Sequence, residues 1–385
     1  MDTHRLSTLK ALLGRFPRID LGFFPTPLHT LPRLGRTVGH DHLWAKRDDL
    51  TGLGLGGNKV RSLEFFLGQA LAEGADVIIT AGGLQSNLCR LTAAAAAKVG
   101  LECVLVHNDD RPAFYQGNML LSHLFGAREV FLGRVDEEAR ARAVEDVAAQ
   151  LRRTGRRPYV VANGASTPLG VLGYVRATAE LCEQWSGLSG GAAGACSAGA
   201  PSGGVSSARV SPAANLAPSS PPIRQVAMVG AMAGTVSGLV LGVALLGHPF
   251  HVQVISVEYP EPHLRGLIHD LGARAWALLR AAEAPAELGP DPESDAFADW
   301  LNAAMTIHGD YLGPGYAIPT ELSRRVLFDA ARLEGLLVED VYTSKTLAGL
   351  LDLIHRGVIT RGEPCCFWHT GGLAALFAQA DKLQP

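Results

Sequence analysis

Short apolar runs alternate with helical segments along most of this chain of 385 residues. The runs at 76–80, 103–106 and 252–257 have the length and composition of strands that are buried on both faces. Longer segments between them, such as 136–153, space their apolar residues as amphipathic helices do. This alternation predicts an α/β fold built on parallel sheets, with helices on both faces and right-handed crossovers.

One segment, 226–247, contains no charged residue, and its glycines recur at every fourth position from Gly230 to Gly242. The same pattern is typical of a transmembrane helix with a close-packing glycine face. The glycines dilute its hydrophobicity, however, and no positive cluster flanks either end. We therefore predict a buried strand at 225–229, a glycine turn and a buried helix from about residue 236, with no membrane association.

The composition argues against several classes of protein. A net charge of −3 without any run of Lys or Arg gives no field for a nucleic-acid backbone. The six cysteines are scattered and form no C-x-x-C pair, so we predict neither a disulfide framework nor a metal site. Residues 1–6 are mixed in polarity and lack the apolar core of a secretory signal, so we expect a cytoplasmic protein.

A glycine-rich loop delivers a lysine to the start of a helix. Three glycines precede the lysine in Gly54-Leu55-Gly56-Gly57-Asn58-Lys59, and apolar residues follow it at helical spacing. An amine in such a position becomes a nucleophile if its surroundings lower its pKa. Further glycine-rich turns follow predicted strands at 82–87, 164–167, 230–235 and 370–372, on the sheet edge where parallel sheets bind ligands.

The turn Gly230-Ala231-Met232-Ala233-Gly234-Thr235 lies between a predicted strand and a predicted helix, where backbone N–H groups can bind a phosphate. It matches neither the dinucleotide-binding pattern nor the Walker pattern. A cofactor that carries a phosphate and also bonds covalently to Lys59 explains both features. Pyridoxal 5'-phosphate is such a cofactor.

A series of longer motifs runs through nearly the whole chain outside residues 187–222. In order they are 24–28 (FPTPL), 46–53 (KRDDLTGL), 56–59 (GGNK), 82–87 (GGLQSN), 234–235 (GT), 314–316 (PGY), 341–343 (VYT) and 369–372 (HTGG). With these motifs the chain resembles the D-cysteine desulfhydrase and 1-aminocyclopropane-1-carboxylate deaminase family. Members of that family are pyridoxal-phosphate enzymes of the two-lobed tryptophan-synthase-β fold (fold type II).

The resemblance implies roles for the motif residues. Lys59 would bond to the cofactor and, once released, remove the Cα proton of the substrate. Thr370 would meet the pyridine nitrogen with a neutral hydroxyl, and the 230–235 turn would hold the phosphate. Tyr316 and Tyr342 would act as acid/base or positioning groups on the substrate side. The other predicted site residues are Asn58, Gln85, Ser86, Asn87 and Thr343, of which Ser86 and Asn87 would hold the substrate carboxylate and the phenolic oxygen of the cofactor.

Most of these roles have a structural alternative. Ser86 and Asn87 could cap the helix that follows them, and Thr370 could be an ordinary turn residue. Tyrosines beside Pro-Gly often pack with a satisfied hydroxyl. We assign His369 and Cys89 to packing rather than to catalysis.

Two positions distinguish the two activities of the family. Thr343 and Thr370 stand where its deaminases resemble one another in having Glu and Leu. This favours β-elimination from a small amino acid with a thiol or similar leaving group, giving pyruvate and ammonia. Departures from the family pattern at Leu88, Ser62, Met232 and Glu339-Asp340 leave open racemisation, β-replacement, deamination of the aminocyclopropane type, or a non-catalytic relative.

The same resemblance implies two domains and a homodimer. We expect a larger cofactor-binding domain formed by 1–53 and 166–385, and a smaller α/β domain formed by 54–165. Residues 187–222 are rich in Gly, Ala, Ser and Pro, and Arg209 is their only charged residue. Such a composition buries too little apolar surface to offset its ordering entropy, so we predict a flexible insertion there.

Overall fold

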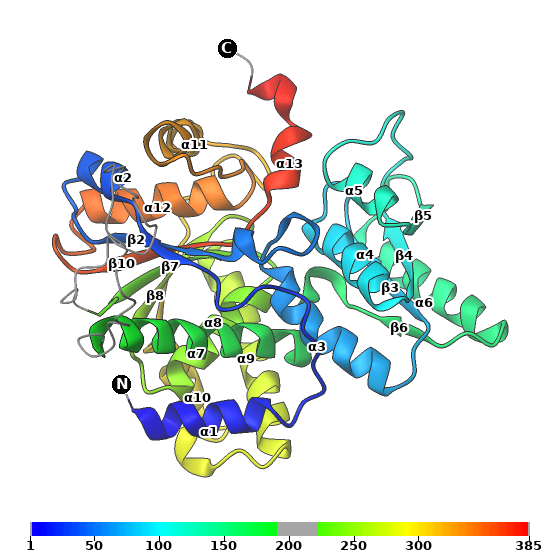
Figure 1. The fold of residues 1–385 in the computed structure, drawn as a ribbon, viewed down its shortest axis with the longest axis horizontal. Coiled ribbons are helices and arrows are strands. Elements are labelled where there is room, and N and C mark those ends of the chain that lie inside the picture. The colour runs from blue at the N-terminus through cyan, green and yellow to red at the C-terminus, as the bar shows by residue number, and fades with distance from the viewer. Residues whose placement is uncertain (1, 191–221, 384–385) are drawn as a thin grey trace, which may run out of the picture.

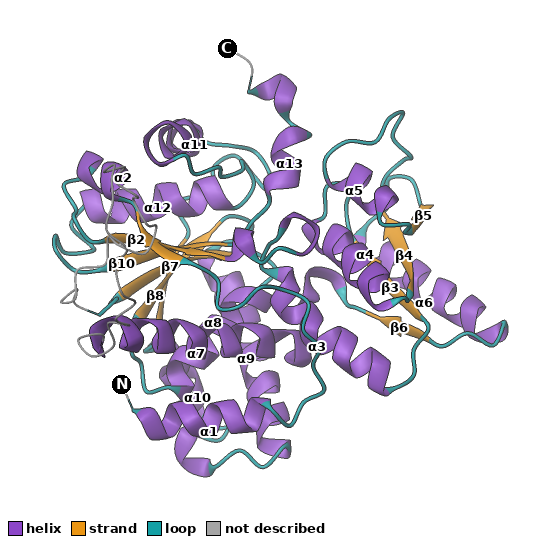
Figure 2. Cartoon of the chain, viewed as in Figure 1, coloured by secondary structure: helices purple, strands orange, loops and turns teal. Residues whose placement is uncertain are grey.

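The computed structural model describes residues 2–190 and 222–383, and two sheets lie side by side in it (Figures 1 and 2). The larger contains β1 Leu28–Thr30, β2 Leu43–Arg47, β7 Gln225–Gly230, β8 His251–Ser256, β9 Met305–His308 and β10 Cys365–His369, in the order β1-β2-β10-β7-β8-β9. The smaller contains β3 Val77–Ala81, β4 Glu102–His107, β5 Arg128–Phe131 and β6 Pro158–Val160, in the order β5-β4-β3-β6. All neighbouring strands are parallel except β1 and β2.

Helices cover both faces of each sheet (Figure 2), which confirms the predicted α/β fold. On the larger sheet, α12 packs against one face and α8 against the other; on the smaller sheet, α4 and α6 do so. The helices are α1 Thr3–Leu13, α2 Pro32–Thr37, α3 Lys59–Ala72, α4 Asn87–Val99, α5 Asn118–Leu124, α6 Glu137–Arg153, α7 Pro168–Gly190, α8 Gly234–Leu245, α9 Glu261–Ala281, α10 Asp295–Asn302, α11 Glu321–Glu334, α12 Thr343–His355 and α13 Leu373–Phe377.

The uncharged segment forms β7, a turn and α8, as predicted. Every residue of α8 is buried, and its glycines let α7 approach closely. A Cβ added at Gly238 would lie 2.4 Å from the carbonyl oxygen of Val171, and one at Gly242 would lie 2.5 Å from Oγ1 of Thr178. The four-residue glycine spacing therefore serves the packing of two core helices. Within the described residues, no helix combines the length and the apolarity needed to cross a bilayer.

Some predicted elements were wrong. The helix expected at 294–307 ends at Asn302, because β9 begins at Met305 and pairs with β8. The helices α1, α2, α5, α9 and α13 were not predicted. Helix α9 spreads its buried residues among charged ones and carries Pro262 in its first turn. Of the predicted flexible insertion at 187–222, residues 187–190 belong to α7, and 191–221 lie outside the described residues.

Helix α3 connects the two halves of the molecule. Its Phe65 belongs to the core of the larger sheet, whereas Val60, Leu63 and Phe66 belong to the core of the smaller sheet. Lys59 is the first residue of this helix, so the helix brings it to the junction of the two sheets (Figure 1). A division into 1–53 with 166–385 and 54–165 remains our proposal for the domain boundaries.

Candidate active site

The glycine loop before Lys59 has a backbone that only glycine tolerates. Gly56 and Gly57 have φ of 69° and 134°, in a region that side chains rarely enter. A Cβ at Gly56 would lie 2.0 Å from the carbonyl oxygen of Asp49. The N–H of Gly57 donates to the carbonyl oxygen of Asp48 (2.9 Å) and to Oγ1 of Thr51 (2.8 Å). These contacts fix the direction in which α3 begins.

The amine of Lys59 points to the turn that follows β6. Its Nζ donates to the carbonyl oxygen of Gly164 at 2.6 Å. Burial lowers the pKa of this amine from 10.5 to about 8, and the nearby Glu258 carboxyl offsets burial only in part. About a tenth of these amines are thus neutral at pH 7 and about half at pH 8, far more than for an ordinary lysine, and a nucleophile or a general base requires the neutral form.

The predicted phosphate turn lies against the same segment. Oγ of Ser166 accepts from the N–H of Gly234 at 3.2 Å and donates to the carbonyl oxygen of Met232. The backbone of Ala233, the residue before α8, is in the left-handed region (φ 60°). Among the described residues, the N–H groups of Thr235 and Val236 have no hydrogen-bond acceptor. Free N–H groups at a helix start, aligned with the helix dipole, bind anions.

Asn58 joins three predicted parts of the site. Its Nδ2 donates to Oγ1 of Thr235 at 2.8 Å, and its N–H donates to the carbonyl oxygen of Thr370 at 2.9 Å. Thr370 follows β10 and is buried, and its hydroxyl makes no hydrogen bond within the described residues. The structure therefore brings together Asn58, Lys59, the 230–235 turn and Thr370.

Gln85, Ser86 and Asn87 lie at the start of α4, on the smaller sheet. Ser86 caps the helix, since its Oγ accepts from the N–H of Cys89 at 3.2 Å. Capping is the structural alternative that the sequence left open for this residue. Oδ1 of Asn87 accepts instead from Asn118 (3.2 Å) and Arg90 (3.4 Å). Asn118 also donates its N–H to Oε1 of Gln85 at 2.9 Å. Sequence reasoning missed Asn118, because 31 residues separate it from Asn87.

Tyr316 and Tyr342 share a hydrogen bond between their hydroxyls. No hydrogen bond in the described part of the chain joins this pair to Ser86 or Gln85. Tyr342 directly precedes α12, as predicted, and the carboxylate of Glu339 accepts from the N–H groups of Val341, Tyr342 and Thr343 at 2.8–2.9 Å. Glu339, a departure from the family pattern, therefore holds the start of the helix that presents Tyr342.

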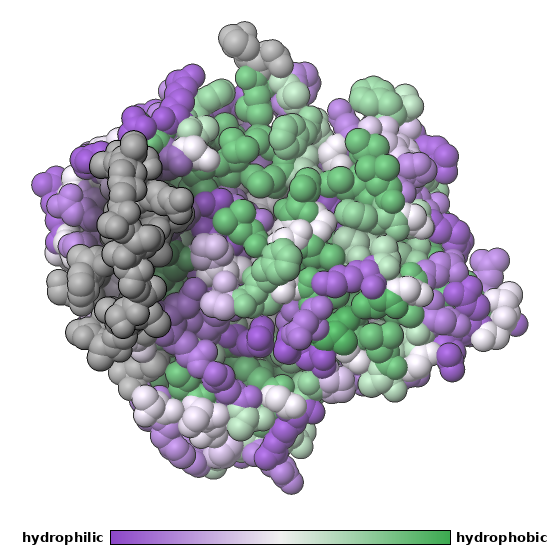
Figure 3. Space-filling view, viewed as in Figure 1, coloured by the Kyte–Doolittle hydropathy of each residue, from purple (hydrophilic) through white to green (hydrophobic). Residues whose placement is uncertain are grey.

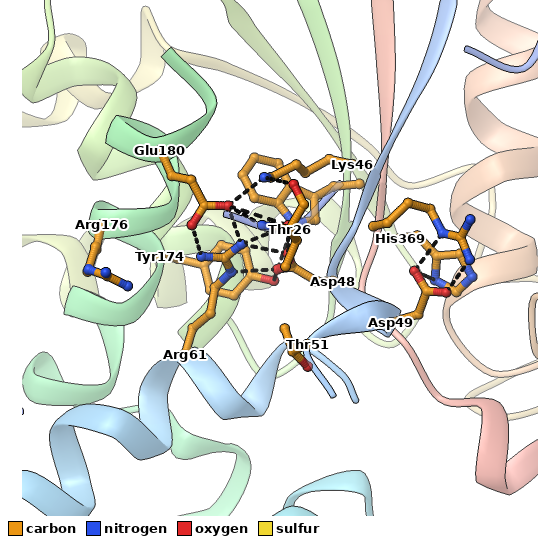
Figure 4. A network of polar contacts seen from close by, with 12 residues as sticks. Thr26, Lys46, Asp48, Asp49, Thr51, Arg61, Tyr174, Arg176, Glu180 and His369 are labelled. Atoms are coloured by element: carbon orange, nitrogen blue, oxygen red, sulfur yellow. Dashed lines mark hydrogen bonds and ion pairs between the residues drawn. The ribbon is translucent and has the colours of Figure 1, made fainter. Parts of the chain in front are cut away.

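Behind the glycine loop lies a buried network of charges that sequence reasoning did not predict (Figure 4). Arg61 donates to both oxygens of Asp48 (2.7 and 2.8 Å) and to both of Glu180 (2.8 and 3.0 Å). Lys46 ion-pairs with Glu180, and Tyr174 donates to Asp48 at 2.5 Å. Two cations thus balance two carboxylates, which makes their burial tolerable.

Glu180 also lines a cavity of about 380 Å³ on the outer side of this network. The walls of that cavity include Arg18, Phe24 and Arg176. None of the predicted site residues lines it, so we do not assign it to the active site.

Other predictions have mixed outcomes. Nε2 of His369 donates to the carbonyl oxygen of Leu337 at 2.8 Å, and burial raises the pKa of the Cys89 thiol to about 11, so both residues serve packing as predicted. Leu88, a departure from the family pattern, is buried in the core of the smaller sheet. Ser62 is buried and donates to the carbonyl oxygen of Gly170 at 2.8 Å.

The comparisons with known proteins agree with this geometry. A family model described as "Pyridoxal-phosphate dependent enzyme" matches residues 19–371. The chain is 32% identical over 373 residues to a putative 1-aminocyclopropane-1-carboxylate deaminase of Pyrococcus horikoshii, covering 97% of each chain. It is 35% identical over 376 residues to a D-cysteine desulfhydrase of Klebsiella pneumoniae, covering 96% of this chain and 98% of the relative.

Solved structures agree as well. The crystal structure of an ACC deaminase homologue superposes with a TM-score of 0.77 at 31% identity, covering 98% of both chains. The structure of threonine deaminase isoform 2 from Solanum lycopersicum superposes with a TM-score of 0.61 at 14% identity. The match covers 100% of this chain and 88% of that chain, so the two share the fold.

Proposed function

The chain belongs to the family of pyridoxal-phosphate dependent enzymes, and we propose that it eliminates the β-substituent of a small amino acid, as a D-cysteine desulfhydrase does. The products would be pyruvate, ammonia and the leaving group. The observation that carries this proposal is the amine of Lys59, which burial holds at a pKa of about 8 and which donates to Gly164 in the turn after β6. The 230–235 turn lies against that same segment, through Ser166.

Three features of the chain fit the cofactor, pyridoxal phosphate. The free N–H groups of Thr235 and Val236 suit its phosphate. The unpartnered hydroxyl of Thr370 suits its pyridine nitrogen, and Lys59 suits its aldehyde. Met232 replaces a hydroxyl residue of the family here, but the hydroxyl of Ser166, from the neighbouring 164–167 turn, lies 3.2 Å from the nitrogen of Gly234.

When bound, the cofactor supplies an electron sink for the pair of electrons left by the Cα proton. Lys59 in its neutral form removes that proton. The start of α4, with Ser86 and Asn87, binds the substrate carboxylate. Thr370 would meet the pyridine nitrogen of the cofactor with a neutral hydroxyl instead of a carboxylate, which would suit prompt loss of the β-substituent.

The tyrosine pair is suited to give a proton to the leaving group. Burial raises the pKa of Tyr342 well above 10, and the neighbouring Tyr316 raises it further. Burial also raises the pKa of Tyr316. Both hydroxyls therefore stay protonated at working pH and can donate.

An assay of products tests this function. With pyridoxal phosphate added, we expect pyruvate from D-cysteine and from β-chloroalanine, and little 2-oxobutyrate from 1-aminocyclopropane-1-carboxylate. L-cysteine in parallel reports stereochemical preference. Faster 2-oxobutyrate formation would reassign the chain to ring-opening deamination. Exchange of the Cα proton with D₂O without any oxoacid would indicate racemisation instead.

The exposed apolar residues support the homodimer proposed for this chain. Leu120 and Leu124 lie on α5 and are 41% and 68% exposed. The start of α5 lies against the end of α13, since a Cβ at Gly117, just before α5, would lie 2.9 Å from Cβ of Ala378, just after α13. Phe377 of α13 is 65% exposed, and Figure 3 shows hydrophobic side chains gathered on this face. Apolar patches of this kind mark interfaces.

We expect Leu124→Glu to shift the protein toward the monomer in sedimentation equilibrium. Val358→Glu, at an exposed apolar residue after α12, should leave the mass unchanged. A wild-type protein that sediments as a monomer would contradict the proposal.

The five described cysteines are buried and form no disulfide. Reduced cysteines support the cytoplasm as the compartment of this protein, and cell fractionation checks it.

A further inference from the structure

Arg90 is a fully buried residue of α4 whose side chain reaches back to the glycine loop. Its Nη1 donates to the carbonyl oxygen of Gly54, and its Nη2 donates to that of Gly56 at 3.0 Å. These two carbonyls belong to the loop that delivers Lys59. Buried carbonyl oxygens without a donor cost free energy, so the guanidinium stabilises this conformation of the loop.

Arg90 has no carboxylate partner within 4 Å in residues 2–190 and 222–383. Burial lowers the pKa of its guanidinium to about 10, which leaves it charged at neutral pH. Arg61, on the other side of the loop, has two carboxylates. The positive charge of Arg90 is therefore uncompensated by the protein beside the predicted binding groups for two anions, a carboxylate and a phenolic oxygen.

The same guanidinium orients Asn87. Arginine has only donors, so the side-chain atom of Asn87 that lies 3.4 Å from Nη2 of Arg90 must be the oxygen. Asn118 donates to that oxygen as well, at 3.2 Å. The Nδ2 of Asn87 is left without an acceptor among the described residues and is presented as a donor.

We propose that Arg90 is a positioning residue that fixes both the loop carrying Lys59 and the amide of Asn87, so that Asn87 offers its N–H groups to an anionic oxygen of the cofactor or the substrate. This inference rests on the proposed function for the identity of the ligand. It assigns to Arg90 two effects that can be measured separately, one on the loop and one on Asn87.

The test compares Arg90→Met, Arg90→Lys, Asn87→Ala and the double variant Arg90→Met/Asn87→Ala. We expect Arg90→Met to weaken the binding of pyridoxal phosphate to the apoenzyme by about 10²-fold, because it removes the charge-assisted hydrogen bonds that hold the loop and Asn87. In the Asn87→Ala background the same change should have a clearly smaller effect, because the amide that it orients is gone. Arg90→Lys keeps the charge but replaces the planar fork of two donor nitrogens with a single one on a different stem, so we expect an intermediate loss.

A readout without cofactor tests the loop. Amide hydrogen exchange in the apoenzyme should accelerate at residues 54–58 in Arg90→Met, and should not do so in Arg140→Met. Arg140 is a matched control, because it is buried in the same half of the molecule and contacts Asn108 and Glu137 instead of the loop.

Two results would overturn the proposal. One is full additivity of Arg90→Met and Asn87→Ala in cofactor affinity; the other is unchanged exchange at 54–58. If the wild-type protein bound no pyridoxal phosphate, the proposed function would fail, and the exchange experiment would still decide whether Arg90 holds the loop.

Discussion

Replacing Lys59 with alanine is expected to lower the rate of β-elimination by at least about 10³-fold, since a positioned general base alone contributes 10²–10⁴-fold and Lys59 also binds the cofactor covalently. Borohydride treatment should join pyridoxal phosphate to the wild-type peptide that contains residue 59 and to no peptide of the variant. Mass spectrometry of the digested protein measures this directly.

Two variants separate chemistry from folding. Lys59→Arg keeps a positive charge but has no neutral amine, so it should be as inactive as Lys59→Ala. Lys98→Ala removes a lysine of α4 whose Nζ donates to the carbonyl oxygen of Leu21 at 2.9 Å, away from the site, and it should retain activity. Residual turnover within tenfold of wild type in Lys59→Ala would contradict the assigned role.

The reactivity of this amine should depend on pH in a defined way. Burial favours the neutral form and sets the pKa at about 8, so the neutral fraction falls tenfold for each pH unit well below 8 and levels off above about 9. Covalent capture of pyridoxal phosphate by the apoenzyme, trapped at each pH, should follow that curve. A midpoint near 10.5, the ordinary value for lysine, would show that the amine is solvated.

Replacing Arg61 with methionine should destabilise the protein by about 3–5 kcal/mol, because it leaves Asp48 and Glu180 buried with only Lys46 to balance them. Urea unfolding followed by circular dichroism measures the change. The substitution should also lower activity, since Arg61 lies two residues beyond Lys59 on α3.

An exposed ion pair provides the control. Arg142 pairs with Glu138 on the surface of α6, and Arg142→Met should cost less than about 1 kcal/mol. Equal effects at the two positions would contradict the importance of the buried network.

Acid should weaken this network as well. Burial alone would raise the pKa of Glu180, but Arg61 and Lys46 outweigh burial and hold it at about 2, against 4.5 when unfolded. The folded pKa is the lower one, so its stabilisation is complete above about 4.5 and is lost as pH falls toward 2.

The sequence predicted what depends on local pattern. The apolar run before the turn at Gly230 predicted β7, and the Gly56-Gly57 loop predicted that α3 begins near Lys59. Contacts between residues far apart in the chain could not be predicted from local pattern. The carboxylate of Glu180 that accepts from Arg61, for example, lies 119 residues away. Arg61 and Arg90 both read as ordinary helix residues, because nothing local distinguishes a buried arginine from a solvated one.

The position of β10 in the larger sheet has a consequence for how the protein is made. It is the last strand of the described residues, yet it lies between β2 and β7, and Thr370 follows it directly. Until residues 365–369 leave the ribosome, the sheet lacks its middle, and its two halves expose unpaired edges that can associate with other chains. A nascent chain would therefore depend on protection until β10 is free to pair, and deletion of β10 should leave an aggregate rather than a weakened enzyme.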